Sequence, residues 1–172
     1  NNTIANLNNT STNTTTATNG TSSTFTHTSG IWVISSSTTG GTITGNTIYN
    51  LACAATPTSS GGGTGAIVSG IAYYNVSSTS PANISSNTVH SLAISSASTS
   101  SVLLMGGIFF TGTSINHTLA KNFVHSLNVT AANPNVSMRG MEILGGTPLV
   151  HSNMIRLGIR PDGSSLTTPV SI

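Results

Sequence analysis

One six-residue motif recurs along the whole chain, and its spacing limits what the chain can fold into. The motif reads NTIANL at Asn2, and further copies begin at Asn46, Asn87, Asn122 and Asn153. Each of the last four copies has an aliphatic residue three places before its Asn and Ile or Val two places after it. Recurrence at this scale is typical of a solenoid, in which each repeat stacks on the previous one.

A second marker, a glycine followed by a short apolar run, precedes each of the last four copies. These glycines are Gly30, Gly70, Gly107 and Gly140. Each repeat therefore holds three short runs typical of β-strands and shows no helical periodicity. We predict an all-β fold, a right-handed parallel β-helix with three short strands per coil and about four to five coils, in which residues 1–172 form a single segment of a longer solenoid.

The repeats shorten along the chain, and almost all of the variation falls between the hexamer and the next glycine marker. Length variation confined to one part of a repeat indicates loops at one corner of the coil. We expect successively shorter insertions at that corner, formed by residues 8–29, 52–69, 93–105 and 128–139.

Alternation along the hexamer predicts which side chains face the core. Two aliphatic columns should point inward: Ile4, Ile48, Val89, Val124 and Ile155, and then Leu7, Leu51, Leu92 and Leu127 past a bend. An outward column should contain Ala5, Tyr49, His90, His125 and Arg156. At the preceding corner we expect a structural ladder, because Asn tolerates left-handed backbone geometry and its amide can bond the equivalent Asn one coil away. Its members are Asn46, Asn87, Asn122 and Asn153.

The glycine-marked strand predicts a candidate binding surface. Alternation points Ile31, Ile71, Ile108 and Met141 inward and Trp32, Ala72, Phe109 and Glu142 outward, with Ile34, Tyr74 and Leu144 also outward. Aromatic faces pack on the apolar faces of sugar rings, so Trp32, Tyr74 and Phe109 are candidate glycan-binding residues. The competing interpretation is that a neighbouring chain or the insertions cover this stripe.

The composition excludes several classes of function. Only four Lys and Arg and two Asp and Glu residues are present, whereas Ser, Thr and Asn make up 75 of the 172 residues. Four scattered cations are too few for a nucleic-acid surface, and no stretch is long and apolar enough to insert into a membrane. Glu142 and Asp162 are the only carboxylates, and they lie on different elements, so the acid pair of a glycoside hydrolase is not expected. We predict that the protein is not an enzyme.

No cofactor or metal site is expected. His90 and His125 should lie one coil apart on the surface, but no carboxylate, thiolate or third ligand recurs beside them. His27, His117 and His151 fall in different columns, and a single Asp supports no Ser-His-Asp relay. Cys53 is a lone cysteine, for which a buried apolar role is the more common.

The hexamers, the Gly-Ile runs and the segment LGIRPDGSS together resemble bacterial cell-surface proteins built of right-handed parallel β-helix repeats, a group common among proteins exported by type IX secretion. The resemblance covers nearly the whole chain. It implies an extracellular or cell-surface location and an adhesin or stalk. The same coil also carries lyases and tailspikes, so the motifs specify the fold better than the activity.

The leading functional hypothesis is therefore a non-enzymatic structural scaffold, such as a surface stalk, fibre or filament segment. The alternative is a glycan-binding module of an adhesin or of a polysaccharide-processing protein, which would use Trp32, Tyr74 and Phe109. The expected partners are identical or contiguous β-helix segments stacked end to end, and possible surface glycans. Uncapped ends would otherwise expose unpaired strand edges and the aliphatic columns to water.

Overall fold

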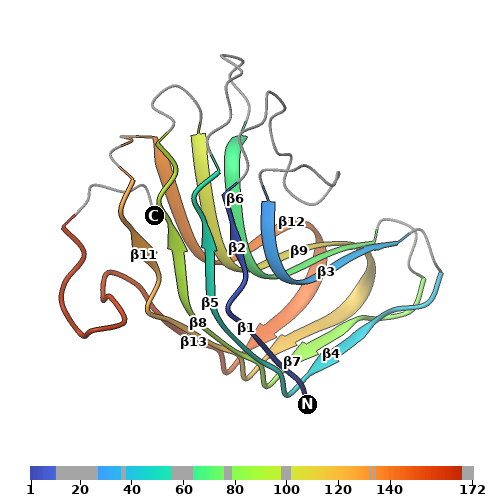
Figure 1. The fold of residues 1–172 in the computed structure, drawn as a ribbon. Coiled ribbons are helices and arrows are strands. Elements are labelled where there is room, and N and C mark those ends of the chain that lie inside the picture. Colours follow the sequence, from blue (N-terminus) through green and yellow to red (C-terminus); the bar gives the residue numbers. More distant parts are fainter. Residues whose placement is uncertain are drawn as a thin grey trace.

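The fold is built of β-strands that lie in two curled parallel sheets (Figure 1). The computed structural model describes residues 1–10, 27–35, 38–55, 64–75, 79–97, 102–131, 133 and 135–167, and these contain no helix. Sheet A contains β1 (Thr3–Ala5), β2 (Asn8–Asn9), β5 (Thr47–Cys53), β8 (Thr88–Ile94), β10 (Phe123–His125), β11 (Asn128–Val129) and β13 (Met154–Arg156). Sheet B contains β3 (His27–Ser35), β4 (Thr42–Thr44), β6 (Thr64–Asn75), β7 (Asn83–Ser85), β9 (Val102–Ala120) and β12 (Val136–His151).

The hexamers form sheet A, and they pair in the register that the sequence predicts. Ile48 of β5 is in register with Ile4 of β1 and with Val89 of β8. The series continues through Val124 of β10 to Ile155 of β13. Because every pairing is parallel and joins one repeat to the next, successive repeats stack directly on one another.

The glycine-marked runs form sheet B, and there the repeats differ in continuity. The first part of β9 pairs with β6, and its last three residues, Thr118–Ala120, pair with β7. One continuous strand in the third repeat therefore corresponds to two separate strands in the second. The β12 strand follows β9 around the same bend, with register shifts between Ile143 and Leu149. In Figure 1 both strands curve through the bend.

A single large apolar core fills the space between the two sheets. The inward columns are fully buried in the middle repeats, where Ile48, Val89 and Val124 are all 0% exposed. At the two ends the same columns open to solvent, because one neighbour is missing within these residues. Leu7 is 42% exposed and Ile155 is 43% exposed.

The glycine marker has a steric cause. A Cβ on Gly107 would lie 2.4 Å from Cγ1 of Val124 in the hexamer of the same repeat and 2.5 Å from the carbonyl oxygen of Gly140. Gly70 faces Val89 in the same way. The two sheets thus approach closely at this column, and only a residue without a side chain fits there.

The predicted asparagine ladder is present and runs through all the repeats. Oδ1 of Asn87 accepts hydrogen bonds from the backbone N–H and from Nδ2 of Asn46, at 3.0 and 2.9 Å. Asn87 donates to Oδ1 of Asn122 in the same two ways, at 3.1 and 3.0 Å. Asn122 repeats the pattern with Asn153. A second bond ties each amide to the preceding corner, as when Nδ2 of Asn87 donates to the carbonyl oxygen of Ile43 at 2.9 Å.

The expectation that these asparagines occupy left-handed backbone geometry is wrong. The left-handed residues are the ones immediately before them, namely Gly45, Ser86, Lys121 and Ser152, with φ between 57° and 68°. A second left-handed column follows the outward residues of the hexamer, at Asn6, Asn50, Ser91 and Ser126. Asn is favoured at the ladder position because its amide both donates and accepts hydrogen bonds between repeats. The residue before each Asn adopts the left-handed conformation of the turn.

The four predicted insertions begin and end at equivalent positions in successive repeats. They leave sheet A from the row of Asn8, Ala52, Ala93 and Asn128. They re-enter sheet B at the row of His27, Ile67, Leu104 and Ser137. Residues 11–26, 56–63, 98–101, 132 and 134 lie outside the described residues. The insertions therefore begin and end at one corner, as expected from the shortening of the repeats.

Candidate functional site

A row of aromatic and basic side chains lies on the outer face of sheet A. Tyr49 of β5, His90 of β8 and His125 of β10 are in register, and Arg156 of β13 continues the row. The Tyr49 and His90 rings stack with centroids 5.1 Å apart and planes 2° apart. The His90 and His125 rings stack at 4.9 Å and 4°. Parallel pairing at the spacing of neighbouring strands thus brings these rings face to face, as the outward column predicted.

The stacked histidines have lowered pKa values and fixed ring orientations. Burial lowers the pKa of His90 and of His125, and for His125 the nearby His90 and Arg156 lower the pKa further. Nδ1 of His90 lies 3.0 Å from the Ser91 hydroxyl, and Nδ1 of His125 lies 2.8 Å from the Ser126 hydroxyl, so a hydrogen bond fixes the orientation of each ring. In the described part of the chain no three His, Cys, Asp or Glu residues gather as a metal site.

Next to this row the outer face of sheet A is hollowed. The hollow has a volume of about 380 Å³. Its lining joins three strands of sheet A to a later segment of the chain and consists of Tyr49, Asn50, Ser91, Leu92, Ala93, Asn128 and Pro161. None of these side chains carries a full charge. The lining therefore offers one aromatic ring, two amides and a hydroxyl.

The far wall of the hollow is a closed hairpin formed by residues 157–167, drawn in red beside β11 in Figure 1. Ile159 and Ser165 form an antiparallel bridge, and the backbone N–H of Leu166 donates to the carbonyl oxygen of Gly158 at 2.7 Å. Leu157 and Leu166 pack against the core. The hairpin, part of the LGIRPDGSS segment, is thus fixed by its own hydrogen bonds and by apolar contacts.

The outer face of sheet B does not carry the predicted aromatic stripe. Phe109 is 2% exposed and packs with Ile67 and Leu104 in a second apolar cluster. Its ring lies over Gly106, so a Cβ added to that glycine would be only 2.3 Å from Cζ of Phe109. Ala72, also expected to be exposed, is 1% exposed. These residues do point outward, but the neighbouring side chains on that face cover them.

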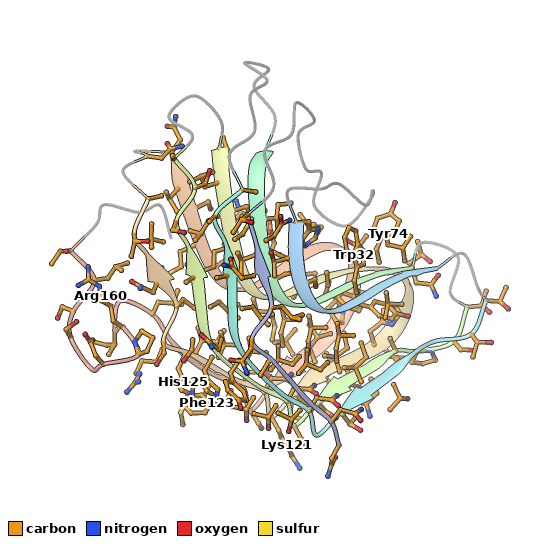
Figure 2. All side chains as sticks on the ribbon, in the orientation of Figure 1. Trp32, Tyr74, Lys121, Phe123, His125 and Arg160 are labelled. Atoms are coloured by element: carbon orange, nitrogen blue, oxygen red, sulfur yellow. The ribbon has the colours of Figure 1, made fainter. Side chains whose placement is uncertain are left out.

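Trp32 and Tyr74 are only half-buried, and they lie on the far side of the molecule from His125 (Figure 2). Trp32 packs against the cluster of Phe109, and its ring contacts His27 with centroids 4.2 Å apart. Ile34 and Leu144, two other residues predicted to face outward, are 48% and 50% exposed. A platform of Trp32, Tyr74 and Phe109 is therefore incomplete, since one of its three rings is buried.

The two carboxylates are both engaged within the protein. Glu142 of β12 forms an ion pair with Arg139 of the same strand. Asp162 accepts hydrogen bonds through Oδ1 from the backbone N–H of Ser164 at 2.9 Å and from its hydroxyl at 2.7 Å. These two bonds from Ser164 lower the pKa of the Asp162 carboxyl. Each carboxylate therefore stabilises its own local segment, Glu142 in β12 and Asp162 in the hairpin.

Three other titratable groups, His27, His117 and Cys53, belong to the packing. Burial lowers the pKa of His27 to about 4 and lowers the pKa of His117. Nδ1 of His117 accepts a hydrogen bond from the backbone N–H of Ala82 at 2.8 Å. Cys53 is completely buried, and burial raises the pKa of its thiol. A buried thiol with a raised pKa is a poor nucleophile, which agrees with the apolar role expected for Cys53.

Comparison with protein-family models, with curated proteins and with solved structures finds no match for this chain. Within the described residues, no helix has the length and apolar character needed to cross a membrane. The hollow beside Tyr49 was not anticipated from the sequence. The clustered turn residues of LGIRPDGSS are the available signal for a hairpin, but no sequence pattern shows that the hairpin lies against sheet A.

Proposed function

We propose that this chain is a structural segment of a right-handed parallel β-helix with three strands per coil, and that it acts as a non-enzymatic extracellular or cell-surface scaffold. The resemblance to cell-surface β-helix proteins in its hexamers and Gly-Ile runs supports this location. One observation carries the proposal. The face formed by β13 and the last part of β12 exposes the same aliphatic columns that are buried one repeat earlier.

The exposed face presents the apolar columns on which another repeat would stack. Val150 is 44% exposed and Ile155 is 43% exposed, whereas Leu119 and Val124, their partners in register, are 0% exposed. The asparagine ladder is also directional, because each backbone N–H donates to the Asn of the following repeat. A further repeat beyond Asn153 would extend both the apolar columns and the ladder without any change in geometry.

The chemistry of the described residues favours a passive role. Glu142 is held by Arg139, and Asp162 is held by Ser164, so neither carboxylate is placed for proton transfer. General acid–base catalysis needs a titratable group within hydrogen-bonding reach of the substrate. The neutral surface of Ser, Thr and Asn residues is instead suited to an uncharged rod. Hydrogen bonds between successive repeats would stabilise such a rod.

The proposal is tested by association of the segment in solution. Sedimentation velocity over a range of concentrations should show growth into linear assemblies, which electron microscopy should show as rods. Ile155→Lys places a charge on the exposed column and should abolish this growth. Asn83→Lys, on an exposed residue of β7, which pairs with a strand on each side, is the matched control and should leave the growth unchanged. A folded monomer of 17.3 kDa at every concentration would contradict the proposal.

A further inference from the structure

We propose that the hollow on the outer face of sheet A binds a single neutral sugar residue of a glycan, with Tyr49 as its aromatic wall. This proposal does not depend on the scaffold role, because it rests only on the hollow and its lining. The site also differs from the surface of Trp32 and Tyr74, which lies on sheet B.

The size of the hollow fits a small ligand. Its volume of about 380 Å³ is near the lower end of the range for sites that hold small molecules, about 300–1,000 Å³. Its walls come from two independent parts of the chain, the strands of sheet A and the hairpin that carries Pro161. Hydrogen bonds within the hairpin and the packing of Leu157 and Leu166 hold that wall in place.

Tyr49 provides the aromatic surface that a pyranose needs. One face of its ring stacks on His90, which fixes the plane of the ring. Ala5, the residue in register on the other side, lies on β1, away from the strands that line the hollow. Tyr49 therefore borders the hollow as a ring already held in place by His90, and apolar C–H groups of a sugar can pack against it at low entropic cost.

The polar groups of the lining favour hydroxyl ligands. Asn50, Ser91 and Asn128 supply two amides and one hydroxyl, groups that both donate and accept. Oδ1 of Asn128 is buried and has no hydrogen-bond partner within the protein. A buried acceptor without a partner costs about 1–3 kcal/mol. Rotation of this side chain toward the hollow would let the oxygen accept a hydrogen bond from a ligand hydroxyl.

The two charged residues that flank Pro161 do not line the hollow, which favours a neutral sugar over an acidic one. Next to Pro161, Arg160 donates through Nη2 to the hydroxyl of Thr167 at 3.0 Å. On the other side of Pro161, Asp162 accepts from Ser164. Neither charge belongs to the lining. A uronic acid would lose hydration of its carboxylate without gaining an ion pair.

The experiment is a titration of the ¹⁵N-labelled protein with the methyl glycosides of glucose, galactose, mannose, N-acetylglucosamine and glucuronic acid, followed by amide chemical shifts. At least one neutral glycoside should shift the amides of Ser91, Ala93 and Asn128, with a Kd on the order of 1 mM. Tyr49→Ala should weaken this binding at least tenfold. Ala5 shows that the same row tolerates alanine, and circular dichroism checks the fold of the variant. Tyr74→Ala, which removes a half-buried ring from sheet B, is the matched control and should bind as the parent does.

Three results would overturn the proposal. The first is the absence of shifts in the hollow at about ten times the expected Kd. The second is binding that Tyr74→Ala weakens and Tyr49→Ala leaves intact, which would place the sugar on sheet B. The third is tighter binding of the glucuronide than of every neutral glycoside, which would refute the neutral class of ligand.

Discussion

The middle and the last repeats of this protein have the same residue pattern but different environments. In the middle repeat, Leu119 and Val124 are fully buried between neighbouring strands. In the last repeat, Val150 and Ile155 occupy the equivalent positions and are each more than two fifths exposed. The hydrophobic pattern therefore specifies the direction of a side chain. Its burial, and with it most of its contribution to stability, depends on a neighbour that stacks on it.

The asparagine ladder offers the strongest contrast between these two regions. Asn87→Ala removes the acceptor of two donors of Asn46 and the donor to the carbonyl oxygen of Ile43, all in a buried site. We expect a loss of about 4 kcal/mol in the free energy of unfolding, because each buried unpaired group costs about 1–3 kcal/mol. Asn153→Ala should cost only about 1 kcal/mol, since water reaches this half-buried position.

Chemical denaturation with a single structural probe measures both ladder variants under identical conditions. The free energies of unfolding can be compared when the parent protein and both variants show equal denaturant slopes. Equal losses for Asn87→Ala and Asn153→Ala would show that stacking on both sides contributes nothing to the ladder.

The leucine column gives a second matched pair of the same chemical change. Leu92 is 0% exposed between neighbouring repeats, whereas Leu7 of the first hexamer is 42% exposed. Leu92→Ala should destabilise the protein by about 3 kcal/mol, because it removes buried methyl groups and leaves a cavity. Leu7→Ala should cost about 1 kcal/mol, since its side chain already contacts solvent. Thermal unfolding followed by circular dichroism should rank the two variants in this order, and the reverse order would contradict the comparison.

The glycine column gives the smallest expected difference. Gly107→Ala would place Cβ against Val124 and against the backbone oxygen of Gly140, and the backbone cannot move away without disturbing the sheet. We expect a loss of about 2 kcal/mol from this overpacking. The new Cβ of Gly140→Ala would meet only the side chain of Ile155, which is partly exposed and can turn aside. This variant should lose less than about 1 kcal/mol, measured by the same denaturation as Gly107→Ala, and a larger loss than that of Gly107→Ala would refute the steric argument.

Much of the fold follows from positions within the repeat. The hexamer predicted the register of sheet A and the shared outward column of Tyr49 and His90, because parallel in-register pairing places equivalent residues next to each other. It also predicted the asparagine ladder, although the left-handed residue proved to be the one before each Asn. The direction of Phe109 was correct, but its exposure was not. Gly106, three residues before Phe109, leaves room for the ring to lie flat, but strand alternation alone would place the two residues on opposite faces.

The sequence alone therefore determined which residues share a column and which face of a strand each column occupies, because strand alternation and a repeated motif are local properties. Only the tertiary structure decided what covers each face. Phe109 became buried because Ile67 of the neighbouring strand β6 and Leu104 of its own strand pack with it, and the hollow beside Tyr49 formed because a hairpin distant in sequence packs on sheet A. Such coverage depends on which distant segments come together in space, and a repeat pattern carries no information about them.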